Sequence, residues 1–124
     1  MMRIACAVAE KNGIQALVTG ESVGQVASQT LDAMACTNAV CTVPVLRPVV
    51  GMDKEEIVRI ARRIGTFETS ILPYEDCCTI FVAKHPVTKP SLKTIRHSEK
   101  KLADVIDGMM ETAIRTAETI EVEG

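Results

Sequence analysis

Two short apolar segments, separated by helical patterns, restrict this chain to an α/β architecture. The first segment covers residues 14–20 and ends in a Thr-Gly pair. The second covers residues 43–50 and is β-branched and apolar on both faces, as expected of a strand buried in a parallel sheet. Pro44 and Pro48 limit where this second strand can pair. The alternation of helix and strand predicts a parallel sheet with right-handed crossovers.

The segments around the first strand have helical signals. Apolar residues at helical spacing predict a helix over residues 1–11, and an Asn-Gly pair follows as a stop signal. Ser22, with Gln25 three positions later, has the spacing of a capping box and predicts a helix over residues 23–34. A loop is expected over residues 36–42. The chain therefore begins as helix, strand, helix.

A second capping box predicts the helix that follows the second strand. Asp53 and Glu56 have the required spacing, and Gly65 supplies the stop. Between them, apolar residues repeat at helical intervals: Ile57, Ile60, Ala61 and Ile64. Residues 66–97 show no sustained period and are predicted to be irregular and functional. A long amphipathic helix is predicted over residues 102–114.

Length and composition favour one soluble domain, or part of one. The chain has 124 residues, a size that buries a single core. Hydrophobic residues make up 47%, yet no apolar run approaches the roughly 20 residues that cross a bilayer, and a secretory signal pattern is lacking. Five cysteines, with Cys77 and Cys78 adjacent, do not resemble a disulfide framework. We expect a cytoplasmic protein with reduced thiols and no membrane association.

The charge distribution allows only a local contact with nucleic acid. The net charge of -2 does not support binding by bulk electrostatics. Residues 84–101 nevertheless carry one acid, Glu99, and six cations: Lys84, Lys89, Lys93, Arg96, Lys100 and Lys101. This segment suits contact with phosphates, or equally a solvated face. The three aromatic residues are too few for a base-stacking platform.

Ligands of parallel α/β sheets bind at the carboxyl ends of the strands. Here these ends are residues 19–22 and 47–51. Gly20 lets the backbone approach a ligand closely, and a helix N-terminus beside it favours phosphate or a polar base edge. Arg47 has two alternatives, contact with a phosphate or pairing with a carboxylate of the sheet.

Three stretches have a specific combination of motifs: ALVTGESVGQVASQTL at 16–31, VLRPVVGMDKEEIVRIARRIGT at 45–66 and LPYEDCCTIFVAKHPVTKP at 72–90. Together they resemble the second half of the PP-loop domain of the ThiI family of tRNA 4-thiouridine synthetases. The resemblance implies a partial Rossmann-like parallel sheet flanked by helices, with residues 1–124 as the C-terminal part of that domain. It also implies an enzyme that uses ATP and Mg²⁺ to adenylate a tRNA uridine and then transfers persulfide sulfur to give 4-thiouridine. The family is linked to sulfur supply for the thiamine thiazole.

The resemblance also implies site residues. Gly20 and Gln29 match residues that contact the nucleotide in the family; the alternative is a turn glycine and a solvated helix residue. Cys77 and Cys78 match the place of the sulfur-transfer cysteine, and Cys77 is preferred because it directly follows the acidic pair. Adjacent cysteines are poorly suited to form a disulfide with each other, so each thiol is available separately. The alternative is that Cys77 and Cys78 are two small buried hydrophobic residues. A metal site is disfavoured, because the cysteines and histidines match no zinc-binding spacing.

The remaining cysteines and the family partners complete the expectations. Cys6, Cys36 and Cys41 are predicted to be structural, or to resolve a persulfide as a disulfide partner. The resemblance implies tRNA as substrate and a cysteine desulfurase as sulfur donor. The family's phosphate-binding loop and N-terminal RNA-binding modules are absent from these residues, so the chain alone is expected to be inactive and to self-associate, for example as a homodimer. Alternatives are an adenylating enzyme with another substrate and a non-catalytic nucleotide-binding or dimerisation module.

Overall fold

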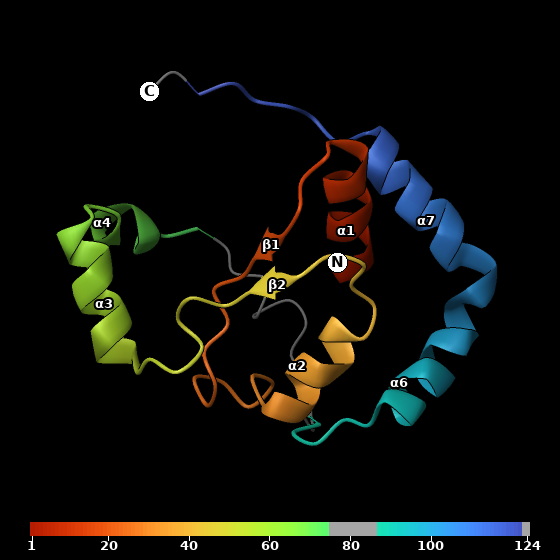
Figure 1. Ribbon diagram of the computed structural model, residues 1–124, viewed down its shortest axis with the longest axis horizontal. Coiled ribbons are helices and arrows are strands. Elements are labelled where there is room, and N and C mark those ends of the chain that lie inside the picture. The colour runs from red at the N-terminus through yellow and green to blue at the C-terminus, as the bar shows by residue number, and fades with distance from the viewer. Residues whose placement is uncertain (75–86, 123–124) are drawn as a thin grey trace.

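The computed structural model describes residues 1–74 and 87–122 and shows helices around two short parallel strands (Figure 1). The strands lie between α3 and α4 on one side and α1 and α7 on the other. The elements in chain order are α1 (Met2–Lys11), β1 (Leu17–Val18), α2 (Leu31–Asn38), β2 (Val45–Leu46), α3 (Lys54–Arg63), α4 (Phe67–Ser70), α6 (Leu92–Glu99), the 3₁₀ helix η1 (Lys100–Leu102) and α7 (Ala103–Arg115). The predicted α/β class is confirmed as a small parallel sheet flanked by helices; a full Rossmann-like sheet stays a prediction.

The two strands pair in parallel, as predicted. Leu17 lies opposite Val45. The N–H of Thr19 donates to the carbonyl oxygen of Leu46 at 3.0 Å, which continues the ladder by one bond beyond β1. Parallel pairing brings the carboxyl ends of both strands to the same edge of the sheet.

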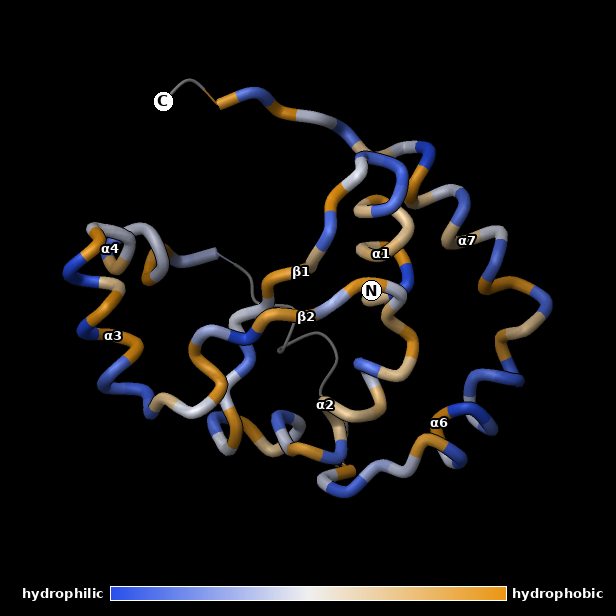
Figure 2. The backbone as a smooth tube through the Cα atoms, viewed as in Figure 1, coloured by the Kyte–Doolittle hydropathy of each residue, from blue (hydrophilic) through white to orange (hydrophobic). Residues whose placement is uncertain are grey.

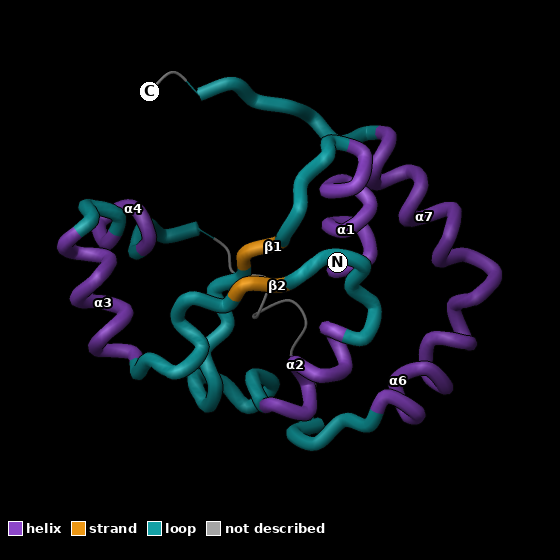
Figure 3. The backbone as a smooth tube through the Cα atoms, in the orientation of Figure 1, coloured by secondary structure: helices purple, strands orange, loops and turns teal. Residues whose placement is uncertain are grey.

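Both strands are shorter than predicted, and loops occupy much of residues 14–20 and 43–50 (Figure 3). After β2 the chain turns, and the N–H of Val50 donates to the carbonyl oxygen of Arg47 at 3.2 Å. Pro48 has no N–H to offer a ladder, so the turn begins where pairing cannot continue.

The first helix ends as the sequence predicted. The Asn12 side chain donates to the carbonyl oxygen of Val8 at 2.8 Å. Gly13 follows with φ of 67°, a left-handed conformation that favours glycine. Within α1, Cys6 and Ala9 are buried.

The helix predicted over residues 23–34 is wrong, because α2 begins only at Leu31. The Ser22 hydroxyl does not cap a helix; it donates to the carbonyl oxygen of Met52 at 2.7 Å. Gly24 has φ of 82°, which interrupts any helix at that point. The side chain of Thr30 caps α2 instead. Part of the loop expected over 36–42 is therefore helical.

The capping box of α3 is confirmed in both directions. The Asp53 carboxylate accepts the Glu56 N–H at 2.8 Å, and the Glu56 carboxylate accepts the Asp53 N–H at 2.9 Å. Gly65 ends the segment with φ of 74°. The guanidinium of Arg62 lies 4.6 Å from the ring centre of Phe67, which connects α3 to α4.

The prediction that residues 66–97 are irregular is wrong in part, because they include α4 and α6. The Ser91 hydroxyl caps α6 by accepting the Thr94 N–H at 3.1 Å. Residues 75–86 lie outside the described part of the chain. The predicted final helix is confirmed as α7, with η1 leading into it.

The described residues bury few apolar side chains completely. These are Cys6, Ala9 and Met34. Val18 and Leu46 on the strands are 69% and 54% exposed. Figure 2 shows hydrophobic residues on both strands and alternating with hydrophilic residues along α3 and α7. An apolar groove of about 670 Å³ lies between α1, α2, α6 and α7. The buried apolar residues of the described chain therefore come from α1 and α2.

An ion pair joins α1 to α6. The Arg3 guanidinium donates two hydrogen bonds to the Glu99 carboxylate, at 2.6 and 3.0 Å. These bonds to Arg3 lower the pKa of Glu99 below its usual range. About a third of each side chain is exposed, so solvent screens part of the interaction.

We expect Glu99→Gln to lower the free energy of unfolding by about 0.5–1 kcal/mol at neutral pH. Because folding lowers the Glu99 pKa, the pair stabilises fully above the unfolded-state pKa of roughly 4.3, and this contribution is lost as pH falls through the folded-state pKa. Urea unfolding at a series of pH values measures the difference. Glu111→Gln, at an exposed position of α7, is the control. A difference that persists unchanged in acid would contradict the assignment.

Candidate functional site

Two loops meet at the carboxyl edge of the sheet: the turn 19–22 after β1 and the loop 47–52 after β2. The Ser22 hydroxyl donates to the Met52 carbonyl oxygen at 2.7 Å, and the Val23 N–H donates to the Val50 carbonyl oxygen at 3.0 Å. Ser22 is 1% exposed, so its hydroxyl needs this internal partner. The two loops are thereby fixed to each other.

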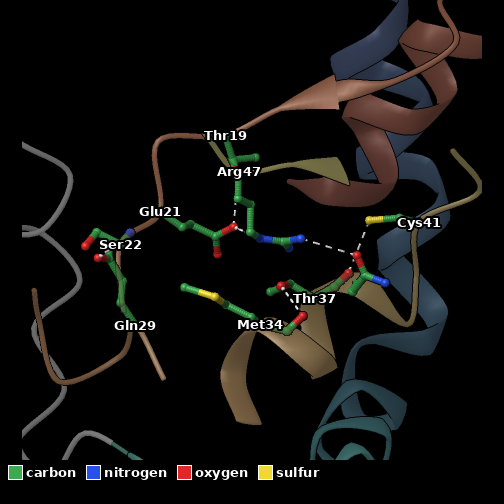
Figure 4. Close-up of polar contacts among 9 residues, drawn as sticks. Thr19, Glu21, Ser22, Gln29, Met34, Thr37, Cys41 and Arg47 are labelled. Atoms are coloured by element: carbon green, nitrogen blue, oxygen red, sulfur yellow. Dashed lines mark hydrogen bonds and ion pairs between the residues drawn. The ribbon is translucent and has the colours of Figure 1, made fainter. Parts of the chain in front are cut away.

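An ion pair crosses this edge (Figure 4). The Nε of Arg47 donates to Oε2 of Glu21 at 2.8 Å, and the Thr19 hydroxyl donates to the same oxygen at 2.9 Å. Nη1 of Arg47 reaches Oδ1 of Asn38 at the end of α2 at 3.4 Å, a long contact. Of the two alternatives for Arg47, the structure shows a carboxylate partner. Sequence reasoning missed Glu21, although it directly follows Gly20 in the TGES motif.

Gly20 is exposed in the turn 19–22, and its φ is not positive. A Cβ built on Gly20 meets no atom within 4 Å in the described structure. The turn itself therefore does not require glycine. The open space lies at the strand end, where ligands of parallel sheets bind.

Gln29 lies in the loop before α2 rather than on a helix, so the reading as a solvated helix residue is wrong. Its side-chain Oε1 accepts the N–H of Ser22 at 3.3 Å, and its carbonyl oxygen accepts the N–H of Gly24 at 2.9 Å. The structure thus brings Gln29 beside the turn 19–22, and its predicted contact with a nucleotide stays a prediction.

Cys77 and Cys78 fall within residues 75–86, outside the described part of the chain, and their predicted role stays a prediction. His97 is exposed on α6, whereas His85 shares the segment of the cysteines. Within residues 1–74 and 87–122, no cluster of three His, Cys, Asp or Glu side chains could hold a metal ion.

The other three cysteines have free thiols: Cys6 lies in α1, Cys36 lies in α2, and Cys41 follows α2. Burial alone would raise the pKa of Cys6, but hydrogen bonds from Thr42 and Val43 more than offset this and lower it. Burial raises the pKa of Cys41, whose thiol contacts that of Cys6. Cys36 donates to the Pro90 carbonyl oxygen at 3.6 Å. Their burial and hydrogen bonds suit the structural role predicted for them.

The described basic residues of the segment 84–101 are all exposed: Lys89, Lys93, Arg96, Lys100 and Lys101. Most lie on α6 and η1. This exposure suits both a solvated face and contact with phosphates, the two alternatives drawn from the sequence. None of the helices in the described residues combines the length and the apolar character needed to cross a bilayer.

The sequence matches the profile of the thiamine biosynthesis protein (ThiI) family over residues 1–103. A probable tRNA sulfurtransferase of Lachnoclostridium phytofermentans is 58% identical over 123 residues, which are 99% of this chain and 32% of the relative. A probable tRNA sulfurtransferase of Acetivibrio thermocellus is 58% identical over 122 residues, 98% of this chain and 31% of the relative. The chain thus spans about a third of the length of these curated relatives.

Among solved structures, the chain is similar to the crystal structure of a 4-thiouridine synthetase–RNA complex with bound ATP. The TM-score is 0.85 and the identity 42%, covering 94% of this chain and 30% of the other. At this identity the likeness extends beyond the fold to the sequence itself.

Proposed function

The chain belongs to the ThiI family of thiamine biosynthesis proteins, and from this premise we propose that it forms part of the ATP-binding, sulfur-transferring domain of a tRNA sulfurtransferase. One observation carries the proposal: two loops are fixed together at the carboxyl edge of a parallel sheet, and none of the described residues fills the space beside Gly20. A chain with 42% identity to this one belongs to a 4-thiouridine synthetase with bound ATP.

In this proposal, Gly20 and Gln29 contact the nucleotide. Gly20 allows the backbone to approach ATP closely, because no atom of residues 1–74 or 87–122 lies within 4 Å of the place where a Cβ would be. Gln29 orients the turn through Ser22 and offers its amide nitrogen to the ligand. Mg²⁺ is expected to arrive on the ATP phosphates, since Mg²⁺ is usually held by one or two carboxylates together with substrate phosphates.

The proposed reaction has two transfers. The uridine oxygen attacks the α-phosphorus of ATP, and pyrophosphate leaves. The terminal sulfur of a persulfide on Cys77 or Cys78 then attacks the activated carbon, and AMP leaves. A second thiolate, from another cysteine of the enzyme or from an external thiol, attacks the cysteine sulfur and breaks the sulfur–sulfur bond; this frees 4-thiouridine and leaves the cysteine in a disulfide that an external thiol reduces. A cysteine desulfurase would supply the persulfide sulfur.

The substrate partner is proposed to be tRNA. The solved relative is an RNA complex, and the exposed cations of α6 and η1 are suited to phosphate contact. The same site would serve a non-catalytic nucleotide-binding module, which is the alternative. Sulfurtransferase activity requires Cys77 or Cys78, whereas a nucleotide-binding module would bind ATP without either thiol.

A chimaera tests the proposal. Residues 1–124 replace the corresponding third of an active 4-thiouridine synthetase, and nucleosides from its tRNA product are analysed by mass spectrometry after reaction with ATP and a cysteine desulfurase. We expect 4-thiouridine at a rate within about tenfold of the parent enzyme, a loss comparable to modest misplacement of catalytic groups. The unmodified parent is the control. A chimaera that folds and binds ATP but forms no 4-thiouridine would favour the binding module.

A further inference from the structure

We propose that Arg47 is a positioning residue, whose guanidinium holds Glu21 and thereby keeps the turn 19–22 in the conformation that binds nucleotide. The inference rests on the proposed function, because ATP is the ligand it concerns. It adds a role for Arg47 and Glu21, which follow the two neighbouring strands β2 and β1.

The contacts show how Arg47 reaches the turn. It follows β2, and its Nε donates to Oε2 of Glu21, which follows β1, at 2.8 Å. The Thr19 hydroxyl donates to that same oxygen at 2.9 Å, so both sides of Gly20 are connected to one carboxylate oxygen. Figure 4 shows Arg47 and Glu21 directed toward each other across the edge. The orientation of Gly20 therefore depends on the Glu21 carboxylate, and the carboxylate depends on Arg47.

The burial of Arg47 argues for an indirect role. Its side chain is only 14% exposed, whereas that of Glu21 is 27% exposed. A ligand at the edge would meet the turn before it met the guanidinium. Arg47 thus acts through Glu21 rather than by touching the nucleotide.

Joining the two loops through Arg47 also lowers the stability of the fold. Its Nη2 is buried and has no hydrogen-bond partner within the described residues. A buried donor without a partner destabilises a fold. The bonds from Ser22 to Met52 and from Val23 to Val50 already join the same loops. Stability alone does not account for an arginine here, whereas precise placement of the turn does.

The test compares Arg47→Met, Arg47→Lys and Glu21→Gln with Arg59→Met, which removes an exposed arginine of α3. Calorimetry with MgATP on the chimaera that carries each variant gives the dissociation constant, and NMR of the same protein gives hydrogen exchange of the Ser22 and Val23 amides. We expect Arg47→Met to raise the dissociation constant about 10- to 100-fold and to speed exchange of both amides. Arg47→Lys should lie between Arg47→Met and wild type, because it keeps the charge but loses the planar fork. Arg59→Met should match wild type.

The double variant identifies the route of the effect. If Arg47 acts through Glu21, then Arg47→Met combined with Glu21→Gln should bind ATP no more weakly than Arg47→Met alone. Wild-type affinity and unchanged amide exchange in Arg47→Met would overturn the inference. Should that variant not fold, Arg47→Lys and Glu21→Gln decide by the same two measurements. A chimaera with wild-type residues 1–124 that does not bind MgATP would instead count against the proposed function, and amide exchange would still show whether Arg47 orders the turn.

Discussion

Replacing Cys77 with serine is expected to abolish formation of 4-thiouridine by the chimaera while leaving its ATP affinity unchanged. A serine hydroxyl cannot carry a persulfide, so the sulfur-transfer step loses its donor rather than being slowed. The loss should be on the order of 10³-fold or more, as for other enzymes that lose a nucleophile. Nucleotide contact is proposed for Gly20 and Gln29, and none is proposed for the Cys77 thiol.

The neighbouring thiol provides a matched comparison. Cys78→Ser makes the same sulfur-to-oxygen replacement in the adjacent residue. Cys36→Ser replaces a half-buried thiol of α2, and the serine hydroxyl can still donate to the Pro90 carbonyl oxygen. We expect both variants to retain 4-thiouridine formation. After incubation with the cysteine desulfurase, intact-mass spectrometry should detect one added sulfur atom on all forms except Cys77→Ser.

The pattern of losses also decides between the two adjacent cysteines. Loss in Cys78→Ser alone would move the persulfide to Cys78. Retention in both single variants, with loss in the double variant, would mean that either thiol can serve. Retention in the double variant would contradict a sulfur-carrying role for this pair and would leave the nucleotide-binding module as the better description.

The helices that could be predicted from the sequence are those whose ends are determined locally. In α3, Asp53 and Glu56 satisfy each other across one helical turn, so the residues that define the start also supply its hydrogen bonds. Gly13 and Gly65 end their helices through a conformation that few other residues adopt. No distant contact is needed in any of these cases, and the predictions were confirmed.

Distant contacts explain the errors. Ser22 has the spacing of an N-cap, but its hydroxyl bonds to Met52, thirty positions away, and the predicted helix does not form. The strands were overextended because apolar, β-branched runs do not show where pairing stops; Pro48 and the turn from Arg47 to Val50 set that limit in β2. A sequence pattern does not reveal a hydrogen bond between distant residues that only folding brings together.

The meeting of the two strand ends was predictable, but their side-chain contacts were not. Parallel pairing brings the segments containing Gly20 and Arg47 together, as expected, and ligand binding at this edge stays a prediction. The partners of Arg47 could not be predicted, because Glu21 and Asn38 come from different elements and no spacing relates them to it. Cys77 and Cys78 lie outside the described residues, so their place relative to Gly20 stays a prediction.

Replacing Gly20 with alanine should weaken ATP binding about 10- to 100-fold without destabilising the fold. The φ of Gly20 is not positive, and an added Cβ meets no atom of the described part of the chain within 4 Å, so the backbone accepts alanine. The free energy of unfolding should stay unchanged or rise by about 0.4–1 kcal/mol, because alanine restricts the unfolded chain. The added methyl group would occupy only the space that the proposal reserves for the nucleotide.

Calorimetry with MgATP and urea unfolding of the same samples separate these effects. Gly108→Ala, in α7 and equally free of nearby atoms, is the control: it should gain stability as a helix residue and bind ATP like wild type. Gly20→Val should bind still more weakly than Gly20→Ala, since the obstruction grows with side-chain volume. Unchanged ATP affinity in both Gly20 variants would place the nucleotide elsewhere, whereas a loss of stability in Gly20→Ala would mean that glycine serves the turn after all. Only the combination of intact stability and weakened binding requires a ligand in the open space beside β1.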